Sequence, residues 1–207
     1  MILMEELKSG TTTVGIKFKD GVVLAADRQA SMGYLVAHRR FKKIFPVTDE
    51  IALAMSGSVG DAQMILNYLR SEMKLYEMQK HKKPSVKACA TLLANIMFSS
   101  RYFPYYIQLL IAGRDEDGYH VYTITPDGAS VEDKFIAAGS GSVVAYGLLE
   151  DKYKEDMDMK EAVNLAVRAI SVATKRDIYT GEGIDVLVIT KGGIRELKEE
   201  EVKGLLS

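Results

Sequence analysis

The sequence has few of the residues on which several classes of protein depend. Among its 207 residues are one cysteine, three histidines, four prolines and no tryptophan. The lone Cys89 cannot form an internal disulfide, which favours a reducing compartment and excludes a cysteine-rich zinc site. His38, His81 and His120 are too far apart in sequence to place two ligands on one helix face. We therefore expect no metal site.

Long apolar runs and an excess of charge of either sign are also lacking. The longest uncharged stretches, 88–100 and 135–149, are shorter than the roughly 18 apolar residues of a membrane span. The apolar run near the amino terminus, 2–4, is too short for a secretory signal. Lys and Arg number 27 against 28 Asp and Glu, without the basic excess of a general nucleic-acid binder. These absences predict a cytoplasmic protein that binds neither membrane nor nucleic acid.

The first half of the chain carries a block of strand patterns followed by two helix patterns. Four β-rich runs have strand length, and a Lys-Asp-Gly turn predicts a hairpin between the first two: 12–18, 22–26, 43–47 and 51–55. Apolar residues then recur at helical spacing from Ala62 to Tyr76, with Ser58 as a candidate cap. A second helix restarts at Pro84 and runs towards Ser100.

The second half repeats this order. Strand patterns cover 106–112, 119–125 and 134–138, and a short helix follows Gly141. A stronger helix spans 159–176, with Asp158 and Glu161 at capping-box spacing. The remaining patterns predict a buried strand, a turn and a charged terminal helix: 184–190, 191–193 and 196–206.

Two strand blocks, each followed by helices, predict an α+β fold. We expect a four-layer αββα sandwich, in which two antiparallel sheets pack face to face and helices cover both outer faces. On this interpretation residues 11–207 form one domain. A two-domain α+β arrangement would give a similar pattern.

Three threonines that follow Gly10 offer two interpretations. Thr11, Thr12 and Thr13 are good strand formers, which alone would explain them. A threonine inside a chain lacks a base, but a terminal threonine carries an α-amino group whose pKa, about 7.7–8.0, suits a general base. Cleavage between Gly10 and Thr11 would create that group. Gly10 has no side chain, which leaves its carbonyl open to attack and permits backbone conformations barred to other residues.

Six blocks of sequence resemble proteasome β subunits, most closely the archaeal type, and appear in the order of that family. They are Gly-Thr-Thr-Thr-Val-Gly-Ile at 10–16, Gly-Val-Val-Leu-Ala-Ala-Asp-Arg at 21–28, Lys-Lys-Ile at 42–44, Met-Ser-Gly at 55–57, Gly-Ser-Gly-Ser with Ala-Tyr-Gly at 139–147, and Arg-Asp-Ile-Tyr-Thr-Gly at 176–181. Together they span nearly the whole chain. The resemblance implies the N-terminal nucleophile hydrolase fold.

The resemblance assigns a role to seven residues. Thr11 matches the amino-terminal nucleophile, Lys43 the lysine beside it, and Asp27 the carboxylate that pairs with that lysine. Gly57 matches the oxyanion position, where a backbone N–H faces the tetrahedral intermediate. The residues that match the group around the amine are Ser140, Asp177 and Thr180. The family usually has serine where this chain has Thr180, and the extra methyl group restricts the rotamers of the hydroxyl.

The resemblance also implies a pocket for the substrate side chain before the scissile bond. No acidic residue is among the matching positions, which are Ala30, Phe41, Phe45, Met55, Val59 and Gln63. Such a wall favours apolar or aromatic side chains over cationic ones, and the flexible Met55 would make the choice among them loose. Phe45 and Val59 could equally be core residues.

The implied function is that of a threonine endopeptidase, formed after autolytic removal of a 1–10 propeptide and needing no cofactor. Family members form seven-membered rings of β subunits stacked between rings of α subunits, a 28-subunit core. An unfolding ATPase delivers unfolded polypeptide to it.

Several alternatives stay open at this point. The chain could be an unprocessed, non-catalytic structural β subunit, an α-type ring subunit, or a subunit of the bacterial two-ring threonine protease. A Ser-His-Asp triad is disfavoured because no serine lies in a nucleophile elbow. A phosphate loop at Gly139–Ser142 is disfavoured because the Gly-Lys-Ser/Thr ending is missing.

Overall fold

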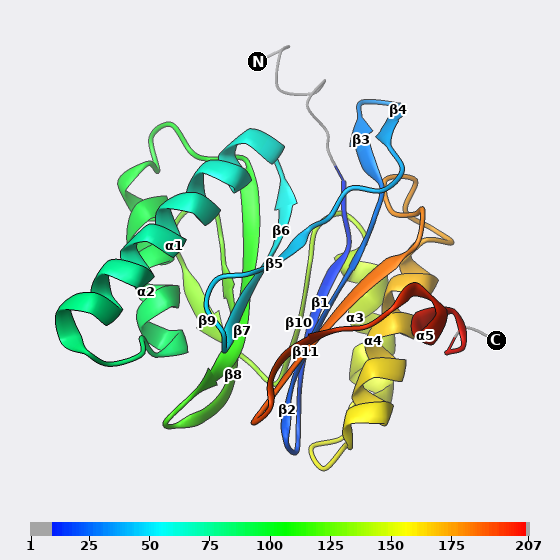
Figure 1. The fold of residues 1–207 in the computed structure, drawn as a ribbon. Helices are drawn as coiled ribbons and strands as arrows, with labels where there is room; N and C mark the ends of the chain where they lie inside the picture. Colours follow the sequence, from blue (N-terminus) through cyan, green and yellow to red (C-terminus); the bar gives the residue numbers. More distant parts are fainter. Residues whose placement is uncertain (1–9, 206–207) are drawn as a thin grey trace.

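Two five-stranded antiparallel sheets form the middle of the molecule (Figure 1). The computed structural model describes residues 10–205. One sheet, here called the β1 sheet, has the order β10-β1-β2-β11-β12, from Phe135–Ala138, Thr13–Phe18, Gly21–Asp27, Ile184–Thr190 and Gly193–Glu196. The other, the β6 sheet, has the order β5-β6-β7-β8-β9, from Ile44–Pro46, Ile51–Gly57, Ile107–Asp115, Gly118–Ile124 and Ser130–Glu132.

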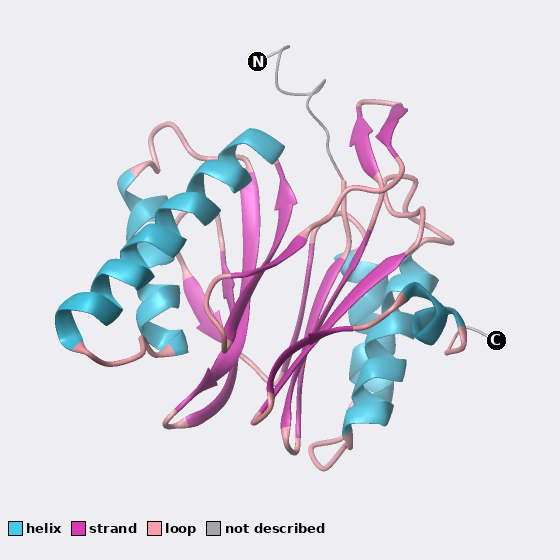
Figure 2. Cartoon of the chain, in the orientation of Figure 1, coloured by secondary structure: helices cyan, strands magenta, loops and turns pink. Residues whose placement is uncertain are grey.

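Helices cover the outer face of each sheet, and the strands lie between the helical layers (Figure 2). Helices α1 (Val59–Lys80) and α2 (Val86–Ser99) pack on the β6 sheet. Helices α3 (Ser142–Lys152) and α4 (Met159–Ala173) pack on the β1 sheet, and the short α5 (Glu199–Lys203) lies against β11. The predicted four-layer αββα sandwich is therefore confirmed.

The two sheets share a core in which strand residues are apolar on both faces. All of β2 is buried, and so is β6 up to Ser56. Leu24, Leu110 and Leu187 come from both sheets and lie in one cluster between them. A strand buried on both faces needs a continuous apolar run instead of an alternating pattern, as 21–26 and 51–55 have.

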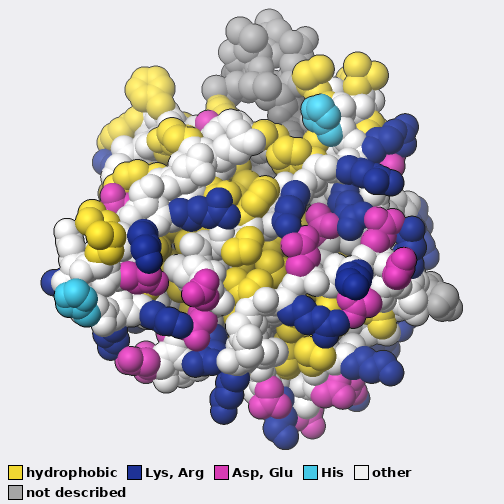
Figure 3. Space-filling view, viewed as in Figure 1, with side chains coloured by type: hydrophobic (Ala, Val, Ile, Leu, Met, Phe, Trp, Pro, Cys, Tyr) yellow, Lys and Arg dark blue, Asp and Glu magenta, His cyan; other side chains and the backbone are white. Residues whose placement is uncertain are grey.

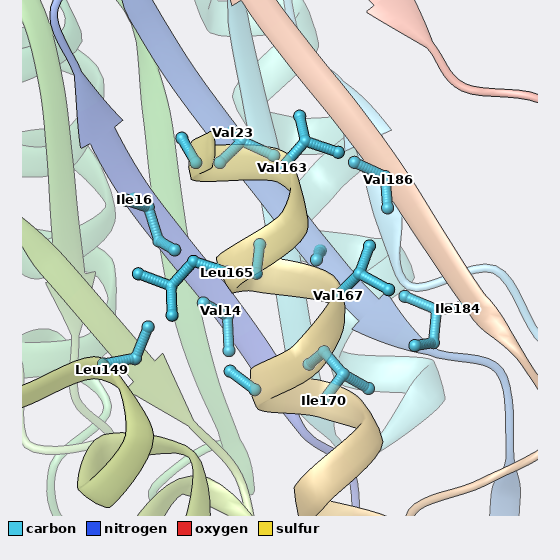
Figure 4. Close-up of a cluster of buried hydrophobic side chains, with 14 of the residues drawn as sticks. Val14, Ile16, Val23, Leu149, Val163, Leu165, Val167, Ile170, Ile184 and Val186 are labelled. Atoms are coloured by element: carbon cyan, nitrogen blue, oxygen red, sulfur yellow. The ribbon is translucent and has the colours of Figure 1, made fainter. Parts of the chain in front are cut away.

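Helix α4 has the strongest amphipathic pattern and covers the β1 sheet (Figure 4). Its Val163, Val167 and Ile170 lie against Val14 and Val186. Burying each such side chain stabilises the fold by about 1.5–3 kcal/mol. The predicted capping box is confirmed: the amide of residue 161 donates to Asp158 Oδ1 at 2.8 Å, and the amide of residue 158 donates to Glu161 Oε2 at 3.0 Å.

Helices α1 and α2 form the second helical layer, whose apolar faces meet the β6 sheet. Ser58 caps α1, as predicted: its side chain accepts from the Asp61 amide at 3.4 Å, and the helix begins at Val59. Leu69 and Leu93 are buried within this layer. There Cys89 is also buried, with its Sγ 3.0 Å from Met73 Sδ.

Short strands are the elements that the sequence did not predict. Strands β3 (Ala30–Met32) and β4 (Leu35–His38) form a two-stranded hairpin, which stands apart from both sheets (Figure 1). The predicted terminal helix over 196–206 is wrong in its first part: β12 pairs with β11, and α5 begins only at Glu199. An exposed edge strand and a charged helix have similar composition, so the pattern did not separate them.

Within residues 10–205, no helix combines the length and the apolarity that crossing a membrane requires.

Candidate active site

The start of β1 and the end of β2 lie side by side because the two strands are antiparallel. Thr12 thereby faces Asp27: the Thr12 amide donates to Asp27 Oδ1 at 2.9 Å, and the Asp27 amide donates to the Thr12 carbonyl at 3.2 Å. Thr11, one residue earlier, is 2% exposed. The strand pairing therefore brings a carboxylate beside the predicted nucleophile.

Asp27 is completely buried and accepts several hydrogen bonds. Lys43 Nζ donates to Oδ1 at 2.7 Å, and the amides of Gln29 and Gly181 donate to Oδ2 at 3.1 and 3.0 Å. Lys43 precedes β5, and its carbonyl accepts from the Met55 amide at 3.0 Å, which fixes its backbone against β6. The predicted Lys43–Asp27 partners thus form a buried ion pair.

Burial works against ionisation of both partners in this pair. It lowers the pKa of Lys43 below its ordinary value, although the nearby Asp27 opposes that change. Burial likewise raises the pKa of Asp27, and the Lys43 ammonium opposes it. The attraction between the two charges thus offsets part of the desolvation that each of them suffers on burial.

A second polar group surrounds the backbone nitrogen of Thr11. The Thr11 amide donates to Ser140 Oγ at 3.1 Å, and Ser140 Oγ donates to Asp177 Oδ2 at 2.6 Å. Thr180 Oγ1 donates to the same Asp177 oxygen at 2.5 Å and lies 2.7 Å from Thr12 Oγ1. The extra methyl group of Thr180 therefore does not keep its hydroxyl from joining Ser140 and Asp177 in this polar group.

Two glycines allow the segment at the start of α3 to approach Thr11 and Thr12. Gly139 has a φ of +89°, and a Cβ there would lie 2.1 Å from the Thr11 carbonyl oxygen. A Cβ on Gly141 would lie 2.0 Å from Thr12 Oγ1. Only a chain without side chains at both positions can bring Ser140 this close to the Thr11 nitrogen. This explains the Gly-Ser-Gly pattern without a phosphate loop.

A small pocket opens beside Thr11 and Lys43. Four of the six residues predicted for the substrate pocket line it: Ala30, Phe41, Met55 and Val59. Gly57, with a φ of +111° at the end of β6, lies in the same lining. The carboxyl end of β6 and the first turn of α1 thus place the predicted oxyanion glycine and the pocket together.

The structure places the other two predicted pocket residues outside this lining. Phe45 is partly buried against the core under α1 and α2, and Gln63 is exposed on α1. Ser56 and Ala62 line the pocket in their place. Ala62 lies three residues after Val59 on the same helix face, a spacing that could have identified it.

Gln29 is a site residue that the sequence reasoning missed. Its Nε2 donates to Ser31 Oγ and to the Ile178 carbonyl, both at 2.9 Å. It therefore ties the loop that carries Asp177 and Thr180 to the end of β2. A buried polar side chain two residues after Asp27 gives no signal of this partner in the sequence.

The peptide bond before Thr11 is held next to the threonine hydroxyl. Thr11 Oγ1 donates to the Gly10 carbonyl oxygen at 2.7 Å. A side chain at this position would have no space, because a Cβ on Gly10 would lie 2.0 Å from Tyr179 Cβ.

Comparison with known proteins agrees with this geometry. Residues 7–189 match the family model described as proteasome subunit. The proteasome subunit beta of Ferroglobus placidus is 48% identical over 206 residues, 99% of this chain and 98% of the relative. Proteasome subunit beta of Methanothermobacter thermautotrophicus is 49% identical over 94% of this chain and 93% of its own length. Proteasome subunit beta 1 of Thermococcus onnurineus is 49% identical over 98% of this chain and its own full length, 100%. The chain therefore belongs to the proteasome subunit family and is similar to its β subunits.

Proposed function

We propose that this chain is the proteolytic β subunit of a proteasome core and that Thr11 is its nucleophile. The observation that carries the proposal is the contact of 2.7 Å between Thr11 Oγ1 and the Gly10 carbonyl, at the buried Asp27–Lys43 pair. Similarity to β subunits supports a peptide-bond hydrolase, and this contact supports threonine as the attacking residue.

The first step is removal of the propeptide, residues 1–10, of which 1–9 lie outside the described part. Thr11 Oγ attacks the Gly10 carbonyl carbon, the Gly10–Thr11 C–N bond breaks, and the hydroxyl proton passes to the departing nitrogen. This forms an ester and a free α-amine. Water then hydrolyses the ester, which leaves a Gly10 carboxylate and restores the Thr11 hydroxyl. The mature domain is 11–207.

The same hydroxyl then attacks peptide substrates. The free amine accepts its proton as general base, while the Lys43 ammonium favours the deprotonated forms of both groups. Ser140, with Asp177 and Thr180 behind it, holds the amine in place. The Gly57 amide stabilises the oxyanion of the tetrahedral intermediate. An acyl ester forms on Thr11, and water releases the product.

The partners follow from the family. We propose that the chain forms seven-membered β rings between rings of α subunits in the cytoplasm, and that an unfolding ATPase supplies unfolded polypeptide. The single, buried Cys89 supports a reducing compartment.

The mass of the chain in purified, peptide-cleaving particles tests the proposal. We expect the chain to begin at Thr11 and expect Thr11→Ala particles to retain residues 1–10 and lose activity. Thr13→Ala is the matched control, because Thr13 is also a buried threonine of the same segment but lies outside the pocket beside Thr11. Active particles whose β chains all retain residues 1–10 would contradict the proposal and favour the non-catalytic alternative.

A further inference from the structure

Gly10 lies in a space that is closed on two sides. A Cβ at this position would lie 2.0 Å from Tyr179 Cβ, 2.5 Å from Tyr179 Cγ and 2.5 Å from Ser140 Oγ. Gly10 itself is buried. Tyr179 and Ser140 therefore form two walls around the residue whose carbonyl faces the Thr11 hydroxyl.

The wall formed by Tyr179 belongs to a tightly bonded loop. The Tyr179 amide donates to Asp177 Oδ1 at 3.2 Å, and the preceding Ile178 carbonyl accepts from Gln29 Nε2 at 2.9 Å. The Gly181 amide donates to the buried Asp27 at 3.0 Å. Bonds on both sides of Tyr179 thus prevent the loop from moving away from Gly10 without breaking contacts of the site.

The opposite wall is equally fixed. Ser140 Oγ donates to Asp177 Oδ2 at 2.6 Å and accepts from the Thr11 amide at 3.1 Å. Asp177 therefore anchors both walls. Between them, the Gly10–Thr11 peptide keeps its carbonyl oxygen 2.7 Å from Thr11 Oγ1.

We propose that Tyr179 is a positioning residue for self-processing: its Cβ and ring press on Gly10 and hold the Gly10–Thr11 peptide against the Thr11 hydroxyl. This inference rests on the proposed function, since it presupposes that Thr11 cleaves the bond before it. Gly10 is then required because Tyr179 occupies the space of its side chain. Tyr179 acts through contact with the scissile peptide, while the bond changes are those of the processing step above.

The test is the rate at which the full-length chain, co-expressed with its α subunit, loses residues 1–10 in assembled particles, followed by intact mass. We expect Gly10→Ala to slow processing by about 10- to 100-fold, the effect of forcing one extra carbon into a packed space. Gly10→Ala combined with Tyr179→Gly should process faster than Gly10→Ala alone, because both Tyr179 contacts are removed, but slower than wild type, because the ring is lost and the Ser140 Oγ contact remains. Gly10→Ala combined with Tyr179→Phe should recover nothing, since Phe retains both atoms.

Two further variants separate positioning from general loosening of the loop. Ile178→Gly is the matched control, because Ile178 is 70% exposed in the same loop, and it should not rescue Gly10→Ala. Tyr179→Ala alone should slow processing by roughly tenfold, since the ring no longer holds Gly10, while Tyr179→Phe alone should process like wild type. The single variants decide the matter if the double variant does not assemble.

The inference is overturned if Tyr179→Ala processes as fast as wild type, or if Ile178→Gly rescues Gly10→Ala as well as Tyr179→Gly does. In either case a processed wild-type chain leaves the proposed function intact. If the wild-type chain retains residues 1–10 in active particles, the proposed function fails, and this inference fails with it.

Discussion

Strands β1 and β2 bury apolar residues along their length and polar residues where they meet the site. Under α4, Val14 and Val23 pack into a cluster of aliphatic side chains. Beside this cluster, Thr12 and Asp27 are also completely buried, but each has named partners at fixed distances. Apolar contacts are non-directional, so one neighbour can replace another, whereas a buried polar group deprived of its partner bears the full cost of desolvation. The aliphatic region should therefore tolerate conservative change, and the polar end should not.

The largest effect expected from this difference is on activity at the polar end. Thr11→Ala removes the proposed nucleophile and should lower peptidase activity by about 10⁴-fold or more, to the background of the assay. The particle should still assemble, because a hydroxyl and a methyl group are a small part of the packing. Turnover of a fluorogenic peptide and size-exclusion chromatography measure the two effects. Near-normal turnover in Thr11→Ala particles would refute the assignment.

Disrupting the buried Asp27–Lys43 ion pair should lower both stability and activity. Lys43→Met leaves the Asp27 carboxylate buried without its cation, which should cost about 3–5 kcal/mol of stability and nearly all activity. The double variant Asp27→Asn with Lys43→Met removes both charges and should recover much of the stability but none of the activity. Denaturant unfolding and peptide turnover are measured on the same preparations. If the double variant is as unstable as Lys43→Met, the stability role assigned to the charge pairing is wrong.

Substitutions in the aliphatic region should lower stability and leave activity unchanged. Ile170→Ala removes a fully buried side chain from the α4 cluster and should cost about 2–5 kcal/mol of stability. Ile170→Val should cost only about 0.5–1.5 kcal/mol. Turnover per assembled particle should stay near wild type for both, because Ile170 belongs to the aliphatic cluster under α4 and is outside the lining of the pocket beside Thr11. A selective loss of turnover in Ile170→Val would break the comparison between the two regions.

The pocket beside Thr11 should produce a smaller effect, visible as substrate preference. None of the described residues that line it is acidic. A cationic substrate side chain would lose hydration without gaining a partner, so we expect peptides ending in Leu, Tyr or Phe to be cleaved at least about tenfold faster than those ending in Arg. Peptides that differ only at this residue provide the measurement. Faster turnover of Arg- or Glu-ending peptides would show that the pocket is wrongly assigned.

The smallest effect is expected at α5, far along the chain from Thr11. Arg28 forms two ion pairs: its Nε donates to Asp185 Oδ1 at 2.6 Å, and its Nη1 donates to Glu199 Oε2 at 3.0 Å. Hydrogen bonds from Lys203 and Arg28 lower the pKa of Glu199 to about 2. Because this pKa is lowered, ionised Glu199 stabilises the folded state at any pH above 4.5, the ordinary pKa. This contribution is lost as the pH falls through about 2.

In wild type, the α5 amides should therefore lose protection from hydrogen exchange as the pH falls from 4.5 to 2. In Glu199→Gln, these amides should already be less protected at pH 6. Glu200→Gln is the control, since the described residues give Glu200 no side-chain ion pair. Identical exchange in wild type and Glu199→Gln would show that the ion pairs with Arg28 and Lys203 do not hold α5.

The layers of the fold were predictable because their helices and buried strands have strong periodicity or long apolar runs. The exposed hairpin β3–β4 was not, since all four residues of β4 are exposed and no burial pattern marks them. Met32, Tyr34 and Leu35 of this hairpin are exposed, and hydrophobic side chains project at the upper right of Figure 3, where Figure 1 places β3 and β4. The same reason applies to the three-residue edge strand β9, which is exposed throughout.

The site was predictable only through resemblance. Lys43 and Asp27 are 16 residues apart in sequence, and Ser140 and Thr11 are 129 apart, separations at which no local pattern indicates contact. Gln29 had no signal, because its partners, Ser31 and the Ile178 carbonyl, are brought to it only by the fold. Phe45 and Gln63 match family positions but lie outside the lining of the pocket beside Thr11.

Chemical modification of the buried Cys89 can report when the α1–α2 layer opens. Burial raises the pKa of this thiol to about 12, so almost none of it is thiolate at neutral pH. Alkylating reagents should therefore modify the native chain only when α1 and α2 separate from the β6 sheet. The labelling rate then measures how often that layer opens, and the α3–α4 layer, which has no cysteine, supplies no competing signal.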